Sequence, residues 1–243
     1  MNTDRKAAII VGILYIIGTV AGILSVVATA PVLNDPGNLA SIAGDGNRLV
    51  VGALLVLTMG LALALVPVVL YPIARKHNEP LALGYVVFRG ALEPIGYIGT
   101  VVPWLALVAV GRGYGQADAA AARAMGSVLL AARDAAGNVL IIVFGLGALM
   151  LYTLLYRSRL IPRWLSVWGL VAIVMHLATV FLILFGRADP MATTLLVLDF
   201  PIFLQEMVMA VWLIVKGFSP SAIVSASAAP GYEIRASHAR AGD

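Results

Sequence analysis

Residues 7–30 read AAIIVGILYIIGTVAGILSVVATA and contain no charged side chain. A helix of about 20 apolar residues, rising about 1.5 Å per residue, crosses the hydrocarbon core of a bilayer. This run is longer than the roughly 7–15 apolar residues of a cleaved signal peptide, so we expect an uncleaved membrane span. Five more predominantly apolar runs are long enough to cross a bilayer, at residues 49–73, 81–110, 136–156, 163–186 and 192–215. The sequence therefore predicts an all-α, polytopic membrane bundle of six transmembrane helices.

The composition of the chain agrees with a membrane protein and excludes several other classes. Of its 243 residues, 61% are hydrophobic and 12% are charged, and the mean hydropathy is +0.99. A soluble domain has about 45–50% apolar and about 25% charged residues. These values exclude a soluble globular domain, a disordered chain and a nucleic-acid binding protein, and the lipid bilayer is the expected partner. Cysteine is absent, which excludes disulfides and thiol chemistry.

The basic residues outside the spans indicate how the helices are oriented. The N-terminus, the connections after the second and fourth spans, and the chain after the sixth span hold ten Lys and Arg residues, including all three lysines. The opposite side holds five, all of them arginine. Short segments rich in Lys and Arg lie on the cytoplasmic side of the membrane. We therefore expect both termini to be cytoplasmic.

Two segments do not have the character of a span. Residues 113–135 are rich in alanine with few charges, which favours a short extracytoplasmic helix that lies on the membrane surface or caps the bundle. Residues 219–243 are rich in Ser, Ala, Pro and Gly and contain too few apolar residues to fold, so we expect a mobile cytoplasmic tail. The predicted division is a six-span membrane domain, residues 1–218, followed by this tail.

Ionisable residues within the spans give the strongest indication of a functional site. A charged side chain at the bilayer centre costs at least about 2.5–3.5 kcal/mol, so such residues usually mark function. The third span carries Arg89 and Glu93, the fifth carries His176, and the sixth carries Asp199 and Glu206. Arg89 and Glu93 are one helical turn apart, and the two acids of the sixth span are two turns apart, so each pair shares a helix face. The sequence predicts that these groups form one polar cluster near the midplane.

Prolines beside two of the acids indicate a pocket at this cluster. Pro94 follows Glu93 directly, and Pro201 follows Asp199 by two residues. Proline kinks a helix, and irregular backbone within a membrane is tolerated where it lines a cavity or is covered by protein. The candidate ligand-binding residues of this pocket are Arg89, His176, Gln205 and the aromatic residues Tyr97, Phe200 and Phe203, with Phe88 beside them.

The charges allow a structural and a chemical interpretation. Arg89 can neutralise Glu93 or Glu206 as a structural ion pair, because buried charges are normally paired. One buried cation faces three acids, so at least one acid is expected to hold its proton and to serve as a hydrogen-bond donor or general acid. His176 is more often a helix contact than a metal ligand, and its spacing from the acids does not favour a metal site. We expect no metal and no cofactor.

Three segments resemble a known family. They are LALGYVVFR at residues 81–89, LYRSRLIPRWLSVWG at 155–169 and QEMVMAVWLIVKGF at 205–218. Together with the first span they resemble the bacterial polytopic membrane family catalogued as domain of unknown function 4386. The resemblance implies a multi-pass protein of the bacterial cytoplasmic (inner) membrane. It places Arg89, Gln205 and Glu206 in recognisable segments and supplies no catalytic residue.

Three classes of function are open at this point. The first is binding or movement of a small lipophilic molecule, with Arg89 meeting its polar group. The second is a membrane-embedded enzyme that cyclises or isomerises a lipophilic substrate. Its acid would be Glu206 or Asp199, Glu93 would be the partner of that acid, and Tyr97, Phe200 and Phe203 would form an aromatic wall. The third is a structural or accessory subunit in which the charges set the helix register. The oligomeric state is not indicated by the sequence.

Overall fold

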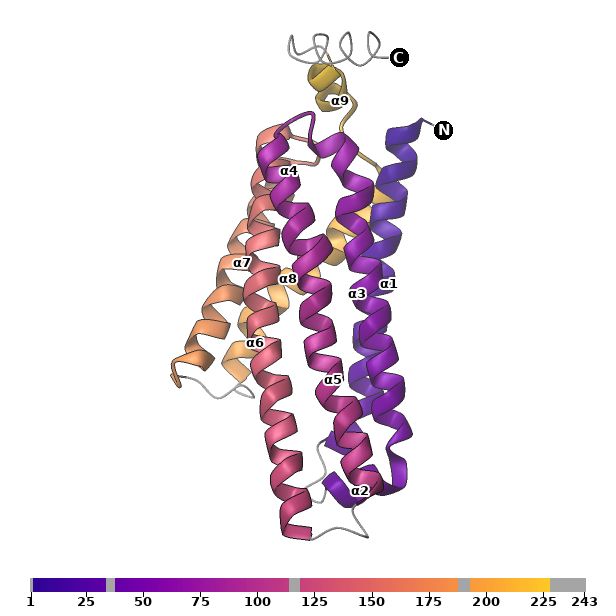
Figure 1. Ribbon diagram of the computed structural model, residues 1–243. Coiled ribbons are helices and arrows are strands. Elements are labelled where there is room, and N and C mark those ends of the chain that lie inside the picture. The colour runs from indigo at the N-terminus through magenta and orange to yellow at the C-terminus, as the bar shows by residue number, and fades with distance from the viewer. Residues whose placement is uncertain (1, 34–37, 114–118, 188–192, 228–243) are drawn as a thin grey trace, which may run out of the picture.

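The structure is a computed structural model that describes residues 2–33, 38–113, 119–187 and 193–227. Helices account for all the regular structure in these residues. In chain order they are α1 (Thr3–Leu33), α2 (Asn38–Asp45), α3 (Asn47–Ala74), α4 (Glu79–Tyr85), the π-helix η1 (Val86–Leu92), α5 (Glu93–Arg112), α6 (Ala119–Ser158), α7 (Arg163–Leu184), α8 (Thr193–Val215) and α9 (Pro220–Ser227). Figure 1 shows the long helices running in one common direction, with α8 crossing them obliquely.

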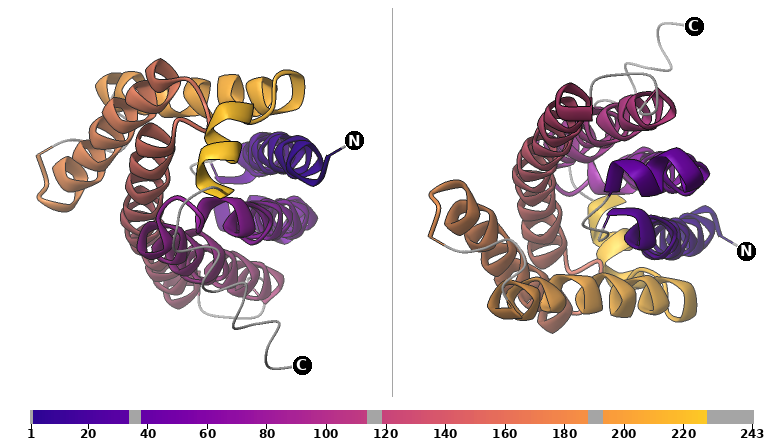
Figure 2. Two further views of the ribbon diagram at one scale, coloured as in Figure 1. Left: turned by 90° about the horizontal axis from the view of Figure 1, so that it is seen from above. Right: turned by 90° about the horizontal axis from the view of Figure 1, so that it is seen from below.

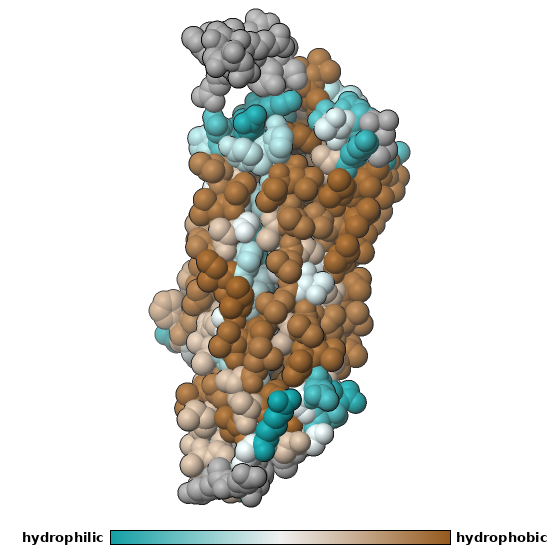
Figure 3. All heavy atoms as spheres, turned by 45° about the vertical axis from the view of Figure 1, so that its right-hand side comes forward, coloured by the Kyte–Doolittle hydropathy of each residue, from teal (hydrophilic) through white to brown (hydrophobic). Residues whose placement is uncertain are grey.

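Six helices in the described residues are long and apolar enough to cross a membrane, which confirms the predicted spans. The third of these spans is composite, because α4, η1 and α5 follow one another without a break from Glu79 to Arg112. Large apolar side chains cover the outside of the bundle, and Val26, Leu61 and Val197 are each more than 60% exposed. Figure 3 shows the result as a broad hydrophobic band with hydrophilic residues gathered at its two ends. Such a surface is stable only against lipid, so the chain is a multi-pass membrane protein.

Glycines allow α1 to approach its neighbours closely. A Cβ atom added at Gly18 would lie 2.8 Å from the side chain of Leu63 on α3. A Cβ atom at Gly12 would lie 2.6 Å from the backbone oxygen of Ala210 on α8. Small residues at helix contacts are the usual means of tight packing in membranes. The first half of α1 is therefore held against both α3 and α8.

An arginine fastens the start of α1 to the end of α8. The Arg5 guanidinium donates hydrogen bonds to the carbonyl oxygens of Leu213, Ile214 and Val215, at distances of 3.0, 2.6 and 3.1 Å. These carbonyls belong to the last turn of α8, where backbone acceptors lack partners within the helix and a cation is favourable. From this contact α8 runs away from α1 towards α7 (Figure 1).

The prediction of a separate short helix over residues 113–135 is wrong. Residues 119–135 are the first turns of α6, which continues without interruption through the fourth span to Ser158. Alanine-rich sequence favours helix as predicted, but helix formation is cooperative, and no proline separates this segment from the apolar run that follows. The short extracytoplasmic helix of the prediction is thus an extension of a transmembrane helix.

The beginning of the expected tail contains a helix. Residues 220–227 form α9, and Ser219 donates its backbone N–H to the carbonyl oxygen of Leu160 at 2.9 Å. Phe218 is buried, at 7% exposure. The remainder of the predicted tail, residues 228–243, lies outside the described residues. The α9 helix lies at the same end of the bundle as the start of α1 (Figure 1).

Candidate functional site

Arg89 lies in the middle of the π-helical segment η1 and is 2% exposed. Pro94 explains the change of helix type, because its ring nitrogen cannot donate to the carbonyl four residues earlier. The preceding residue, Glu93, donates its backbone N–H to the oxygen of Phe88, a step of five residues. Single π-helical turns within α-helices occur frequently at functional sites. The wider turn presents Arg89 to the interior of the bundle.

Two carboxyl groups meet the guanidinium of Arg89. Its Nη1 donates to both oxygens of Glu93, at 3.0 and 3.1 Å, and its Nη2 donates to Oε1 of Glu206 at 3.4 Å. The hydroxyl of Tyr97 donates to the same Glu93 carboxylate at 3.1 Å. The predicted cluster of Arg89, Glu93 and Glu206 is therefore present and joins the third span to α8. Glu93 is enclosed, with a side chain 1% exposed, whereas Glu206 is 16% exposed.

Aromatic rings enclose the free sides of the guanidinium. Its central carbon lies 4.9 Å from the ring centre of Phe144 on α6 and 5.6 Å from that of Tyr15 on α1. Such cation–π contacts stabilise an arginine away from water. Gly147 allows this approach, because a Cβ atom there would lie 3.1 Å from the Cβ of Phe88 and 3.4 Å from the backbone nitrogen of Arg89.

His176 and Asp199 form a second polar group. The Nδ1 atom of His176 on α7 lies 2.7 Å from Oδ1 of Asp199 on α8, and Thr179 donates to the same oxygen at 2.9 Å. Phe144 connects this group to the arginine, because its ring meets His176 edge to face at 5.6 Å. The predicted cluster thus consists of two hydrogen-bonded groups, which Phe144 contacts in common and which both contribute to one cavity lining through Arg89 and His176.

Gln205 forms a third polar contact, at the junction of α6, α7 and α8. Its Oε1 accepts a hydrogen bond from the Tyr152 hydroxyl at 2.6 Å, and its Nε2 donates to the carbonyl oxygen of Leu165 at 3.1 Å. Gln205 and Tyr152 are both fully buried. This geometry makes Gln205, which was predicted to bind ligand, a connector between helices.

A cavity of about 370 Å³ adjoins the arginine. Its polar lining consists of Arg89, Glu206, Tyr97, His176 and Thr19. Its remaining walls are apolar or glycine, contributed by α1 (Gly18, Gly22, Ile23, Val26), α3 (Met59, Leu63), α6 (Leu140, Ile141, Phe144) and α8 (Phe203). A volume of this size is within the range of pockets that hold small ligands.

The aromatic residues of the sixth span are not equivalent. Phe203 lines the cavity, whereas Phe200 is 58% exposed and is absent from the lining, although the two rings lie 6.0 Å apart. Asp199 is likewise absent from the lining and reaches the cavity only through His176. Among the described residues, no group of three or more His, Asp or Glu side chains is arranged to hold a metal ion.

The aromatic and hydroxyl partners of the charges were not predicted from the sequence. Four residues each contact at least one predicted site residue: Tyr15, Phe144, Tyr152 and Thr179. Tyr15 and Tyr152 carried a usable signal, because a tyrosine hydroxyl within an apolar span requires a hydrogen-bond partner. Tyr15 also contacts the hydroxyl of Tyr85 at 3.2 Å, so its partner lies on another helix. Phe144 carried no such signal, since one phenylalanine among many apolar residues is unremarkable.

Figure 2 shows α1, α3 and α5 on one side of α6, with α7 and α8 completing the bundle. The fold and the site define a multi-pass membrane protein in which a buried arginine and two carboxyl groups adjoin a cavity between the helices. The model of the family described as Domain of unknown function (DUF4386) matches residues 10–217, and the chain belongs to that family. This match confirms the resemblance carried by the sequence. No curated protein and no solved structure matches the chain.

Proposed function

We propose that this protein binds or moves a small lipophilic molecule that carries one hydrogen-bonding polar group. The observation that carries the proposal is the cavity of about 370 Å³, whose walls are mostly apolar and whose polar wall contains Arg89 and Glu206. Ligand pockets of this size are typically lined by apolar side chains with a few polar groups that orient the ligand. The apolar walls would receive the lipophilic body, and the charged wall would receive the polar group.

The hydrogen bonds of Arg89 support a ligand with an acceptor atom. Both terminal nitrogens of the guanidinium donate to carboxyl groups, but its Nε is buried and has no hydrogen-bond partner within the described residues. A buried donor without a partner costs about 1–3 kcal/mol. A carbonyl, hydroxyl or phosphate oxygen of a ligand would provide the acceptor once the guanidinium turned its Nε towards the cavity.

Access to the cavity from the bilayer is consistent with its lining. Ile23 and Val26 on α1 and Phe203 on α8 line the cavity and are also 49%, 66% and 41% exposed. The two helices touch at the Arg5 end and diverge beyond it, because α8 turns towards α7 (Figure 1). A lipophilic molecule would therefore enter between α1 and α8 without crossing water.

We also propose a location and an orientation for the chain. The excess of Lys and Arg at the end that carries Arg5, Lys76, Arg159 and Lys216 supports a cytoplasmic position for that end. The start of α1 and α9 both lie at this end. We propose the bacterial inner membrane as its location, as the resemblance of the sequence to this family implies.

Filling the cavity is expected to exclude the ligand without disturbing the charges. In Ile141→Trp the larger indole would occupy the space beside Phe144, so the amount of ligand that copurifies should fall at least about tenfold. Mass spectrometry of organic extracts from the detergent-purified protein measures this amount. The matched control is Val139→Trp on the same helix, which is 59% exposed on the lipid-facing surface and should retain the ligand.

Equal ligand content in both tryptophan variants would contradict binding in this cavity. If only bulk phospholipid is extracted from the wild-type protein and from both variants, the accessory role becomes the better account.

A membrane-embedded enzyme is the second candidate, and one observation favours it. Glu206 lines the cavity, and its side chain is more exposed than that of Glu93, so a substrate in the cavity would meet the Glu206 carboxyl group. A carboxylic acid in apolar surroundings can donate a proton to a lipophilic substrate.

Glu206→Gln separates the second candidate from simple binding. An amide keeps the size of the side chain but cannot transfer a proton, so conversion of the extracted molecule by reconstituted protein should be abolished while the protein stays folded. Folding is checked by size-exclusion chromatography and the unfolding midpoint. Unchanged turnover in the folded variant would eliminate the enzymatic proposal and leave binding intact.

A further inference from the structure

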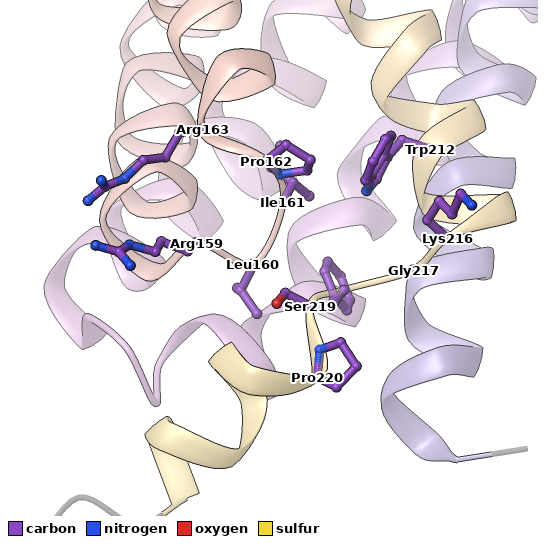
Figure 4. Close-up of a pocket in the computed structure, with 11 residues that line it drawn as sticks. Arg159, Leu160, Ile161, Pro162, Arg163, Trp212, Lys216, Gly217, Ser219 and Pro220 are labelled. Carbon is purple, nitrogen blue, oxygen red and sulfur yellow. The ribbon is translucent and has the colours of Figure 1, made fainter.

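A second pocket lies at the Arg5 end of the bundle, remote from the buried arginine. It has a volume of about 480 Å³ and lies between residues 159–163, which are the α6–α7 connection and the first residue of α7, and residues 216–220, which are the α8–α9 connection and the first residue of α9. Trp212 lies in its wall. Figure 4 shows Arg159 and Arg163 extending side by side away from Trp212 and Lys216, which lie on the opposite side of the pocket. Since both connections join spans to one another or to α9, the pocket lies where the bundle meets the membrane surface.

The charge of this pocket is entirely positive. Its lining includes Arg159, Arg163 and Lys216 and no acidic residue. None of the three cations forms an ion pair with a carboxylate in the part of the chain that the structure describes. Arg163 lies instead over the ring of Tyr156, at 5.1 Å. The three cations are available to an anionic ligand.

The backbone at Arg159 gives independent support for a binding role. Arg159 has a φ of +57°, and among the described residues no other non-glycine residue has a positive φ. It occupies the position after the end of α6, where the left-handed conformation is usually provided by glycine. Backbone strain of this kind is typical of functional positions. An arginine at this position suggests that its side chain has a role other than ending the helix.

An apolar groove adjoins the basic pocket. It has a volume of about 410 Å³ and is lined by Met207, Val208, Val211, Trp212, Val215 and Lys216. Two of these residues, Trp212 and Lys216, also line the basic pocket. Trp212 packs edge to face against Trp164, with 6.3 Å between ring centres. Tryptophans are common at the level of the lipid headgroups. A cationic pocket thus opens beside an apolar groove along α8.

We propose that the basic pocket and the groove together bind one anionic glycerophospholipid. The phosphate would lie between the two connections, and the side chains of Arg159, Arg163 and Lys216 would turn towards it. An acyl chain would follow α8 past Trp212. Basic pockets between helices on the cytoplasmic side of membrane proteins bind anionic headgroups in this way. The groove favours a lipid over a water-soluble phosphate, because only a lipid would use both surfaces. This site is distinct from the cavity at Arg89 and does not depend on the function proposed for it.

Native mass spectrometry of the full-length protein in detergent tests the proposal. The protein is titrated with palmitoyl-oleoyl phosphatidylglycerol and, separately, with the zwitterionic phosphatidylcholine of the same chains. We expect the anionic lipid to bind at least about tenfold more tightly. Replacing Arg159, Arg163 and Lys216 by Gln together should weaken its binding by about 100-fold, since each basic residue at a membrane surface contributes roughly a factor of five.

Two further variants distinguish a specific site from general charge and from misfolding. Arg112→Gln/Arg123→Gln/Arg187→Gln removes the same charge at the opposite end and should leave anionic-lipid affinity unchanged. Arg159→Gly should weaken binding about fivefold. It should also keep or raise the unfolding midpoint, because glycine relieves the positive φ.

Three outcomes would overturn the assignment. They are equal affinity for the two lipids, unchanged binding after neutralisation of the pocket, and an equal loss in the opposite-end variant. Displacement of the anionic lipid by millimolar glycerol 1-phosphate would show that the site takes a soluble phosphate and would overturn the lipid assignment as well.

Discussion

Arg89→Met is expected to destabilise the folded protein by about 3–5 kcal/mol, because removing one member of a buried ion pair leaves the other member uncompensated. Both carboxyl groups that meet Arg89 would lose their cation, and Glu93 is almost completely enclosed. The cation–π contacts with Phe144 and Tyr15 would be lost as well. The unfolding midpoint in detergent, followed by tryptophan fluorescence, should fall by on the order of 10 °C.

The control for this prediction is Arg112→Met, at the end of α5. Arg112 is exposed and belongs to the same composite span, so its loss should change the midpoint little. A midpoint for Arg89→Met that matches this control would contradict a central role of Arg89 in holding the helices together.

Neutralising the whole cluster separates structure from ligand recognition. In Arg89→Met/Glu93→Gln/Glu206→Gln no buried charge remains, so most of the lost stability should return. Ligand content should stay low in this variant if the cluster recognises the ligand. A stable triple variant that retains the ligand would favour a purely structural role for the charges.

Gln205→Leu is expected to produce the second large loss of stability. The substitution keeps approximately the same volume but leaves the hydroxyl of Tyr152 without its acceptor in a fully buried position. A stranded buried polar group costs about 1–3 kcal/mol. The hydrogen bond to the carbonyl of Leu165 would also be lost, which weakens the contact between α7 and α8. The unfolding midpoint relative to wild type measures the effect.

A double-mutant cycle provides the control for Gln205. Tyr152→Phe removes the hydroxyl, so Tyr152→Phe/Gln205→Leu should be more stable than the sum of the single variants implies. Strictly additive losses would show that the hydrogen bond between the two side chains contributes nothing measurable.

How well each part of the fold is predicted depends on how strongly its sequence favours one structure. An apolar run long enough to cross a bilayer has few alternative structures, so the six spans were predicted from the sequence. The family was predicted from three characteristic segments of the chain. The ends of helices outside the bilayer carry a weaker signal. Residues 119–135 show this, because alanine-rich sequence predicts helix without saying whether the helix continues into its neighbour.

The candidate site was most predictable where residues share a helix. Arg89 and Glu93 are one turn apart, and their contact follows from helical spacing alone. The contact of Arg89 with Glu206 required the correct depth of two spans and was also anticipated. The pairing of His176 with Asp199, away from the arginine, depends on the rotation of α7 and the oblique path of α8. The sequence contains no direct measure of the rotation of α7 or of the path of α8.

The most direct measurement is an experimental density map of the protein in lipid nanodiscs, for the wild type and for Ile141→Trp. We expect a non-protein density in the wild-type cavity, with its polar end within hydrogen-bond distance of Arg89 or Glu206. The same density should be absent from the variant. A cavity closed by side chains in the wild type, or a density that ends away from Arg89 and Glu206, would contradict the proposed binding site.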